Sequence, residues 1–444
     1  MSTLKLLILL GLLLPISSCD KDNPPVYPSY TDEEVMDMVQ KDALKYFWDY
    51  AESNSKLARE RYHEDNPSVD AHVVATGGSG FGLMTILVGV ERGFVNRTEA
   101  VQRLSTSLNF LAGADRFHGA WSHWIDGTTG HVIPFGDIDN GGDIVETSFL
   151  CTGLLAVREY FKNGTTEEQT LAQLADSLWL GVEWDWYTKG ENAMYWHWSP
   201  TYEWQINFKL EGYNECLITY ILGASSPTHP IPAAAYHEGW ARSGGIVSAR
   251  TSYNLPIVFY YNGCNTVGPL FWAHYSYLGI NPTGLKDTYG DYQLLTTNHA
   301  KIQHSYCVDN PLQWAGYGDS CWGLTASYTR NSNGTTGYTD HKPGNDKGVI
   351  SPTAALSSMP YTPAESMKFL KYLYEKNADN YIGVAGPYDA FSVHHDWVTP
   401  RYLAIDQGTI APMIENYRTG MLWNLVMSTP EVQAGLQELG FYTN

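Results

Sequence analysis

Apolar residues recur at helical spacing in several segments of this chain, and long loops separate those segments. A capping box, TDEE at 31–34, precedes the first apolar stripe. A second helical pattern over 146–162 stops at Asn163 and Gly164, and another capping box, TTEE at 165–168, starts the next stripe directly after it. These signals predict a helical hairpin over 146–182. We expect further helices over 101–111, near Tyr213, from Thr362, near Gly408 and after Pro430.

The segments between these helices are long and rich in glycine, aspartate, histidine and aromatic residues. They cover 113–143, 183–211, 263–287, 306–346 and 384–406. Loops of this length inside a compact protein usually carry functional side chains. Helix pairs with elaborated loops at one end predict an all-α fold, an α/α toroid in which an inner and an outer ring of helices meet and the loops line a cleft. A helical solenoid is the alternative, but no repeat of fixed period is visible.

The first residues resemble an export signal. One positive charge at Lys5, an apolar run over 6–14 and small residues before Cys19 fit this pattern. The apolar run is too short to span a bilayer. The sequence ISSC at 16–19 resembles a bacterial lipobox, which predicts removal of 1–18 and lipidation of Cys19; cleavage as an ordinary secreted protein is the alternative.

The lipobox defines the expected organisation of the mature chain. Residues 19–29 would form a tether behind a single domain over 30–444, although the length of 444 residues also allows two or three domains. The protein would contact a membrane only through its lipid anchor, in the bacterial cell envelope, facing the periplasm or the cell surface.

The charge and the aromatic content limit the classes of ligand. There are 47 acidic and 27 basic residues, a formal net charge of −20, so phosphate backbones are repelled and nucleic acid is not expected as a partner. Aromatic residues make up 14% of the chain, and charged residues only 17%. This balance favours a surface whose rings stack on the C–H faces of sugars.

The cysteines and the glycine-rich run indicate neither a metal nor a phosphate site. Five cysteines follow Cys19, without CxxC or Cys/His spacing, and whether Cys307 pairs with Cys321 is left open. Cys151 and Cys216 lie in apolar helical patterns and are expected to be buried. The run GGSGFG at 77–82 is explained better by tight packing at a helix start than by a phosphate cradle.

The first candidate constellation is GDIDNGGDIVE at 136–146. If a helix starts near Gly142 or Asp143, then Asp139 lies on the entering loop, and Glu146 lies one turn after Asp143 on the same face. The three carboxylates would converge, and like charges held together raise one another's pKa. The alternative is that Asp143 and Glu146 only cap a helix and complement its dipole.

The second constellation is EGYNE at 211–215, at a loop-to-helix junction. Glu211 and Glu215 are four residues apart, and the pattern after Glu215 is apolar through Ile221. We take Glu211 as a candidate substrate-binding residue. A glutamate at the inner end of a buried helix requires a reason, either a structural hydrogen bond or catalysis, and we favour catalysis.

Aromatic and histidine-rich runs supply candidate sugar-binding residues. They include RFHGAWSHW at 116–124 and YWHW at 195–198, and from these we select His118, Trp121 and Trp196. The run from 386 to 408 adds Tyr388 and Gln407, which carry hydroxyl-binding groups. The histidine spacings lack HExxH, so a zinc site is not expected.

Taken together, these segments resemble the bacterial glycoamylase-like domain proteins and, more closely, the β-1,2-glucanases of glycoside hydrolase family 144. The resemblance runs from about residue 32 to residue 439. The matching stretches are ATGGSGFG at 75–82, RFHGAWSHW at 116–124, DIVETSFL at 143–150, GYNE at 212–215 with ASSPTH at 224–229, GD at 318–319 with CWG at 321–323, and DQGTIAP at 406–412.

The resemblance implies a single-domain (α/α)6 toroid that cleaves β-1,2-linked glucan without a cofactor or metal. Its essential acids correspond to Asp139, Asp143, Glu146 and Glu215. In this interpretation Glu215 protonates the leaving oxygen, Asp139 or Asp143 activates or positions water, and Glu146 holds the others in place. We expect a monomer that acts on an oligo- or polysaccharide with inversion, either in endo mode or in exo mode releasing sophorose.

Two other functions remain open. One is an α-glucan hydrolase, as the glucoamylase name implies, or a transglycosylase on the same toroid. The other is a glycan-binding lipoprotein without catalysis, which would need aromatic platforms but not converging carboxylates.

Overall fold

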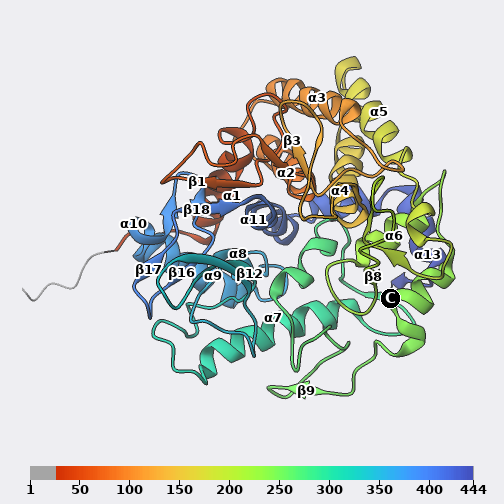
Figure 1. The fold of residues 1–444 in the computed structure, drawn as a ribbon. Helices are drawn as coiled ribbons and strands as arrows, with labels where there is room; N and C mark the ends of the chain where they lie inside the picture. The colour runs from red at the N-terminus through yellow and green to blue at the C-terminus, as the bar shows by residue number, and fades with distance from the viewer. Residues whose placement is uncertain (1–26, 444) are drawn as a thin grey trace, which may run out of the picture.

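The protein is described here from a computed structural model that covers residues 27–443 (Figure 1). The predicted signal peptide over 1–18, the lipidation site Cys19 and most of the tether over 19–29 lie outside these residues. Within 27–443 no helix is long and apolar enough to cross a membrane.

The helices form an (α/α)6 toroid, as predicted. Along the chain, an outer and an inner segment alternate, and the inner segments contact one another around the ring (Figure 1). The inner ring consists of α2 (Thr76–Glu91), α4 (Ile144–Phe161), α6 (Leu217–Ser225), the short helices η4 (Leu270–Ala273) and η5 (Tyr275–Tyr277), α8 (Pro352–Leu356) and α11 (Ala404–Arg418). The outer ring consists of α1 (Asp32–Trp48), α3 (Arg97–Gly113), α5 (Thr166–Leu180), η2 (Ala235–Trp240), α7 (Tyr292–Asp309) and α9 (Pro363–Lys371).

Local sequence signals explain most helix starts. Thr31 and Thr165 both form the predicted capping boxes, with Glu34 and Glu168 respectively. Some starts differ from the prediction: α6 begins at Leu217, four residues after Tyr213. Helix α11 begins at Ala404 and therefore contains Gly408. The remaining helical segments are η1 (Trp186–Thr188), η3 (Arg242–Gly244), η6 (Tyr372–Lys376), α10 (Ala378–Tyr381), α12 (Met421–Met427) and α13 (Pro430–Glu438).

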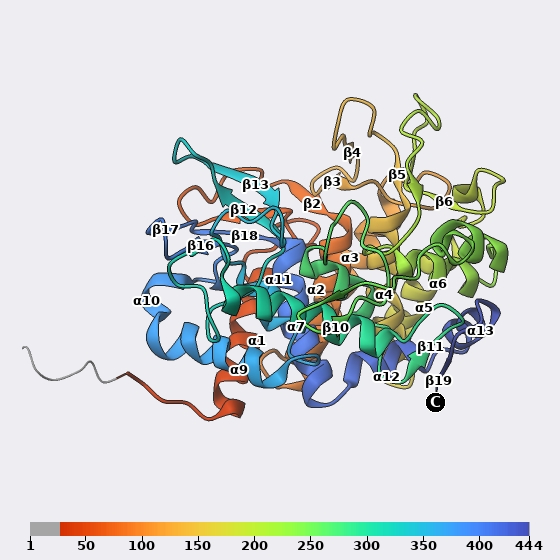
Figure 2. The ribbon, with the colours of Figure 1, turned by 90° about the horizontal axis from the view of Figure 1, so that it is seen from below.

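Short antiparallel strands decorate the toroid, and many of them gather at one end, which we call the loop end (Figure 2). There, β2 (Val73–Ala75), β3 (Trp124–Asp126) and β4 (Val132–Ile133) form a three-stranded sheet. The two-stranded pairs are β1 (Arg61–His63) with β18 (Arg401–Leu403), β5 (Gly142–Asp143) with β7 (His197–Trp198), β6 (Met194–Tyr195) with β8 (Lys209–Leu210), β9 (Thr251–Ser252) with β10 (Leu255–Pro256), β11 (Leu285–Lys286) with β19 (Tyr442–Thr443), β12 (Ala326–Arg330) with β13 (Thr336–Asp340), β14 (Ile382–Gly383) with β15 (Gly386–Pro387), and β16 (Phe391–Ser392) with β17 (Trp397–Val398).

Besides two smaller clusters, the interior contains one large hydrophobic cluster, and its members range from Val35 to Phe441. Several tryptophans are completely buried in it, including Trp121, Trp179 and Trp240. The five cysteines of the described residues are buried free thiols, so Cys307 and Cys321 do not form a disulfide.

The glycine-rich run at 77–82 lies inside α2 and allows close packing against α4, as the sequence indicated. A Cβ atom placed on Gly80 would lie 2.3 Å from the carbonyl oxygen of Phe149 and 2.5 Å from the Cα atom of Leu150. In return, a Cβ on Gly153 would lie 2.3 Å from the carbonyl oxygen of Gly80. The backbones of two inner helices therefore touch at this crossing.

We expect Gly80→Ala to lower the free energy of unfolding by about 3 kcal/mol, because the added methyl group meets backbone atoms that cannot move without shifting a helix. Chemical denaturation followed by circular dichroism measures this. The control is Gly113→Ala at the end of α3, where a Cβ meets no atom within 4 Å. A loss of stability that is equal in both variants would contradict the close packing of α2 and α4.

Candidate active site

One cavity at the loop end holds carboxylates from both predicted motifs. Its volume is about 360 Å³, and Glu146 and Glu215 line it. We call it the carboxylate cavity. Most of its remaining wall is aromatic, and the side chains come from His123, Trp124, Phe135, Phe149, Trp196, Phe271, Tyr275, Tyr328 and Tyr338. A few acids among many rings suit a ligand with apolar faces and hydroxyl groups.

Asp143 is fully buried at the start of α4, and hydrogen bonds occupy both of its oxygens. Oδ1 accepts from the backbone N–H groups of Val145 at 3.0 Å and Glu146 at 2.9 Å, which makes Asp143 the N-cap. Oδ2 accepts from Nδ1 of His123 and from Nε1 of Trp196, both at 2.8 Å. Because a carboxylate offers about four lone-pair positions, Asp143 is suited to orienting His123 and Trp196 and not to activating water.

His123 carries a positive charge between two acids. Burial alone would lower its pKa, but the carboxylates of Glu146 and Asp143 outweigh this effect and raise the pKa to about 9. The imidazole is therefore protonated at neutral pH. Its ring also contacts Phe135, whose centroid lies 4.1 Å away, so a loop aromatic covers the cation.

Glu146 lies one turn into α4 and reaches the N-terminus of α2. Its Oε2 accepts a hydrogen bond from the backbone N–H of Gly77 at 2.7 Å. Burial raises the pKa of Glu146 above its ordinary value, whereas the charge of His123 and the Gly77 hydrogen bond act in the opposite direction. A cation and a helix N-terminus both favour the ionised form of this carboxyl.

Glu215 stands directly before Cys216, the N-cap of α6. Burial raises the pKa of its carboxyl to about 7, and the negative charges of Glu146 and Asp143 reinforce the shift, while the backbone N–H of Glu215 itself opposes it. The hydroxyl of Ser276 donates to the carbonyl oxygen of Glu215 at 2.5 Å, which ties this turn to η5. At neutral pH a substantial fraction of Glu215 is therefore protonated.

Asp139 lies on the loop before β5, as predicted, but it pairs with a histidine beside the cavity. Its Oδ1 lies 3.1 Å from Nε2 of His197. The charge of Asp139 contributes to the raised pKa of both Glu146 and His123, so the three carboxylates of the first motif do influence one site. Glu146 is the member of this motif that lines the cavity.

The structure does not place Trp121 and Gln407 where a sugar platform or a hydroxyl-binding group is needed. Trp121 is completely buried, its Nε1 donates to the carbonyl oxygen of Leu111 at 3.1 Å, and the guanidinium of Arg116 covers its ring. Gln407 is also buried, and its Nε2 donates to the carbonyl oxygen of Ala385 at 2.6 Å. Both side chains are held by the core and by the backbone, and neither lines the carboxylate cavity.

Three other predicted binding residues lie outside the carboxylate cavity. Tyr388 donates a hydrogen bond to Glu64 at 3.0 Å, and Glu211 pairs with Arg242 at 3.4 Å. His118 stacks on Trp186 at a separate pocket. Trp196, by contrast, lines the carboxylate cavity, and its Nε1 is fixed by Asp143.

A second pair of acids, Asp389 and Asp406, lies next to the cavity and was not singled out by sequence reasoning. Both are buried, and burial raises the pKa of both carboxyls, that of Asp389 to about 6. A hydrogen bond between the two carboxyls raises the pKa of Asp406 and lowers that of Asp389. Such a bond requires that the two groups share one proton. The hydroxyl of Tyr275 in the cavity wall donates to Oδ1 of Asp406 at 3.4 Å. Their neighbours Tyr388 and Gln407 were selected instead, because local sequence does not reveal which of two adjacent side chains lies next to a cavity.

Three carboxyls line the cavity, those of Glu60, Glu146 and Glu215, and the last two lie in different environments. Glu146 lies beside the charged His123 and the N-terminus of α2. Among residues 27–443, no cation contributes to the pKa of Glu215. Burial raises the pKa of Glu146 and of Glu215 to about 7, so the charged His123 beside Glu146, and not a difference in pKa, distinguishes the two groups. No group of three His, Cys, Asp or Glu side chains within 27–443 is placed to hold a metal ion.

The sequence and the fold of this chain are similar to those of known proteins. The family model Glycoamylase, described as "Putative glucoamylase", matches residues 207–430. A curated relative from Parabacteroides distasonis, an exo β-1,2-glucooligosaccharide sophorohydrolase acting at the non-reducing end, is 43% identical over 431 residues. That alignment covers 93% of this chain, and the chain spans 58% of the length of that relative.

Two solved structures are similar over almost their whole length. An endo-β-1,2-glucanase from Chitinophaga pinensis, in complex with sophorotriose and glucose, is 52% identical, with a TM-score of 0.91; the match covers 94% of this chain and 99% of that one. A structure from Bacteroides caccae, described as a "putative glucoamylase", is 54% identical, with a TM-score of 0.90; the match covers 93% of this chain and 100% of that one.

Proposed function

Because the chain belongs to the Glycoamylase family, we propose that it is a glycoside hydrolase and that its substrate is β-1,2-linked glucan. The names of the Parabacteroides and Chitinophaga relatives support this linkage. One relative acts in exo mode and the other in endo mode, so the mode of this protein is left to experiment.

The observation that carries the proposal is the pairing of Glu146 and Glu215 in one aromatic-lined cavity. Glycoside hydrolysis requires a protonated carboxyl to donate to the leaving oxygen and an ionised carboxyl on the other side of the sugar. In our proposal Glu215 is the acid, because burial raises its pKa to about 7 and, within the described part of the chain, no cation is among the groups that set this pKa, whereas the charged His123 lies beside Glu146. A binding protein without catalysis would gain nothing from burying both groups, because burial of acids costs stability.

We assign the activation of water to Glu146 in place of Asp139 or Asp143. Glu146 lines the cavity, and the positive charge of His123 supports its ionised form. Asp143 orients His123 and Trp196 through two hydrogen bonds of 2.8 Å, and Trp196 offers its ring to the sugar. The stereochemical proposal is inversion, which requires room for water between the carboxyls. Proton NMR of the first product checks the anomer.

The substrate proposal predicts cleavage of β-1,2-glucan and no turnover of laminarin or starch under the same conditions. The products, separated by chromatography, distinguish a ladder of oligosaccharides, expected for endo action, from sophorose alone, expected for exo action. Hydrolysis of starch without hydrolysis of β-1,2-glucan would contradict the linkage and favour the α-glucan alternative. Product chains longer than the substrate would indicate transglycosylation.

We further propose that the protein is a monomeric lipoprotein of the bacterial cell envelope, anchored through Cys19. The support is the lipobox-like sequence ISSC at 16–19 and the polar segment that separates it from α1. Loss of labelled palmitate from a Cys19→Ser variant is the measurement that checks the anchor.

A further inference from the structure

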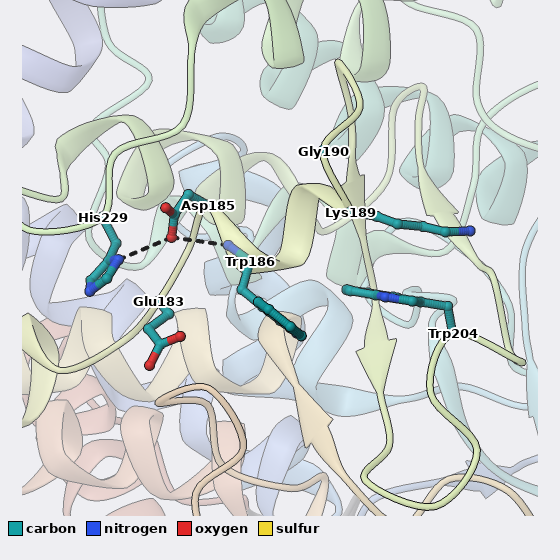
Figure 3. A pocket seen from close by; sticks show the side chains of 7 residues that line it. All are labelled: Glu183, Asp185, Trp186, Lys189, Gly190, Trp204 and His229. Carbon is teal, nitrogen blue, oxygen red and sulfur yellow. Dashed lines mark hydrogen bonds and ion pairs between the residues drawn. The ribbon is translucent and has the colours of Figure 1, made fainter.

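A second cavity lies outside the carboxylate cavity. Its volume is about 400 Å³, and within residues 27–443 it shares no lining residue with the carboxylate cavity. We call it the rim pocket. Its lining residue Trp186 is the first residue of η1, which contacts β6, and β6 lies at the loop end (Figure 2). Its lining residues are shown in Figure 3: Glu183, Asp185, Trp186, Lys189, Gly190, Trp204 and His229.

Trp186 forms a rigid aromatic platform in this pocket. The ring of His118 stacks on it with centroids 3.5 Å apart and an angle of 11° between the planes. Nδ1 of His118 lies 2.9 Å from Oε2 of Glu183, so the supporting ring is itself held in place. Trp186 nevertheless remains 39% exposed, and the indole of Trp204 lies 6.4 Å away with a similar orientation. A large ring that is fixed and partly exposed loses little entropy when a ligand stacks on it.

The polar groups around the Trp186 platform include both hydrogen-bond donors and hydrogen-bond acceptors. Asp185 accepts from the backbone N–H of Trp186 and lies 3.1 Å from Nδ1 of His229 (Figure 3). Lys189 extends along the other side, and its Nζ donates to the side chain of Asn207 at 2.9 Å. Carboxylates, an ammonium group and an imidazole around flat rings match a neutral ligand with many hydroxyl groups. An anionic polymer would be repelled by the chain's net charge of −20.

We propose that the rim pocket is a second carbohydrate-binding site, which holds a segment of a long β-1,2-glucan chain outside the carboxylate cavity. This proposal rests on the proposed function for the identity of the sugar. Trp186 and Trp204 stack on the C–H faces of glucose units, while Glu183, Asp185 and Lys189 bind hydroxyl groups. By holding a distant segment, the pocket raises the local concentration of the same chain at the carboxylates. A short oligosaccharide that fills only the carboxylate cavity gains nothing from it.

The test separates binding from cleavage. In a Glu215→Gln background, Trp186→Ala and Trp204→Ala are expected to weaken retention in β-1,2-glucan affinity electrophoresis by about fivefold each. Trp186→Phe, which keeps a ring, should recover part of the retention. Tyr417→Ala is the control, because Tyr417 is an exposed ring on α11 that lines neither pocket.

In the chain with an intact Glu215, Trp186→Ala should raise KM for the polymer and leave kcat/KM for a β-1,2-linked tetrasaccharide unchanged. Circular dichroism and thermal melting identify a variant that fails to fold, in which case Trp204→Ala carries the test. Unchanged retention in both alanine variants would contradict the proposal that the rim pocket binds β-1,2-glucan. An equal loss of activity on the polymer and on the tetrasaccharide would contradict it as well.

The failure of the proposed function is distinct from the failure of the rim pocket. If the unmodified protein does not cleave β-1,2-glucan, the catalytic assignment fails, yet retention that depends on Trp186 would still support the pocket. Retention by laminarin or by a peptide library, without retention by β-1,2-glucan, would overturn the pocket's assigned ligand.

Discussion

Replacing Glu215 by glutamine is expected to lower kcat for β-1,2-glucan by about 10³-fold, because the variant cannot donate a proton to the leaving oxygen. Glutamine preserves the size and most hydrogen bonding of the side chain, so retention of the polysaccharide should stay close to that of the unmodified protein. Steady-state kinetics and affinity electrophoresis measure the two effects separately. A variant that still turns over at the normal rate would remove Glu215 from the mechanism.

Two controls isolate the proton donation. An aryl β-glycoside with a good leaving group needs little acid assistance, so Glu215→Gln should lose much less activity on it. Glu211→Gln changes an acid four residues earlier that pairs with Arg242 outside the carboxylate cavity, and it should retain nearly normal activity. Equal losses on the aryl glycoside and on the polymer would contradict the role as an acid.

The dependence of kcat/KM on pH tests the same proton donation by Glu215. Glu215 must be protonated to act, so kcat/KM should fall as the pH rises through about 7, the pKa to which burial raises this carboxyl. The glutamine variant lacks a titrating group at this position, and its residual activity should not show the same alkaline limb.

Replacing Asp143 by alanine is expected to lower the free energy of unfolding by about 4 kcal/mol. The variant loses the N-cap of α4, and it leaves Nδ1 of the charged His123 and Nε1 of Trp196 without their acceptor. Urea denaturation measures the loss. Activity should fall as well, because neither ring keeps its orientation in the carboxylate cavity.

The matched control is Asn96→Ala. Asn96 is the N-cap of α3, where its side chain accepts from the backbone N–H groups of Thr98 and Glu99 and serves no buried cation. Its removal should cost about 1 kcal/mol, the usual value for a cap. If Asp143→Ala costs no more than this, the network to His123 and Trp196 does not stabilise the fold. Histidine NMR should also show a lower pKa for His123 in Asp143→Ala, because one of its carboxylate partners is gone.

Local signals made much of the scaffold predictable. A capping box acts within four residues, so TDEE and TTEE marked the starts of α1 and α5 correctly. The apolar stripes showed which helix faces are buried. The order of helices and loops then indicated a toroid, and the spacing of Asp143 and Glu146 placed both on one face at the start of α4.

The positions of the candidate binding residues were harder to predict, because the sequence of a loop rich in aromatic residues does not show which of its rings become buried. Trp121 and Trp196 occur in similar sequences, yet Trp121 packs under Arg116 in the core and Trp196 lines the carboxylate cavity. The difference depends on contacts with other segments: Nε1 of Trp196 donates to Asp143 at the start of α4, whereas Nε1 of Trp121 donates to the carbonyl oxygen of Leu111 in α3. The proton-sharing pair of Asp389 and Asp406 depends in the same way on a contact between the loop after β15 and the first turn of α11.

The amino-acid sequence by itself determined the helices, their alternation with long loops, and the acids that could meet at the start of one helix, because these depend on interactions between near neighbours. Only the tertiary structure decided what those acids do. Closing the ring brings the N-terminus of α2 to Glu146, the charged His123 between Glu146 and Asp143, and Glu215 into the same cavity from the turn before α6. Burial and charge act through space: burial raises the pKa of both Glu146 and Glu215, and, in the part of the chain that the structure describes, only Glu146 has a charged histidine among the groups that set its pKa.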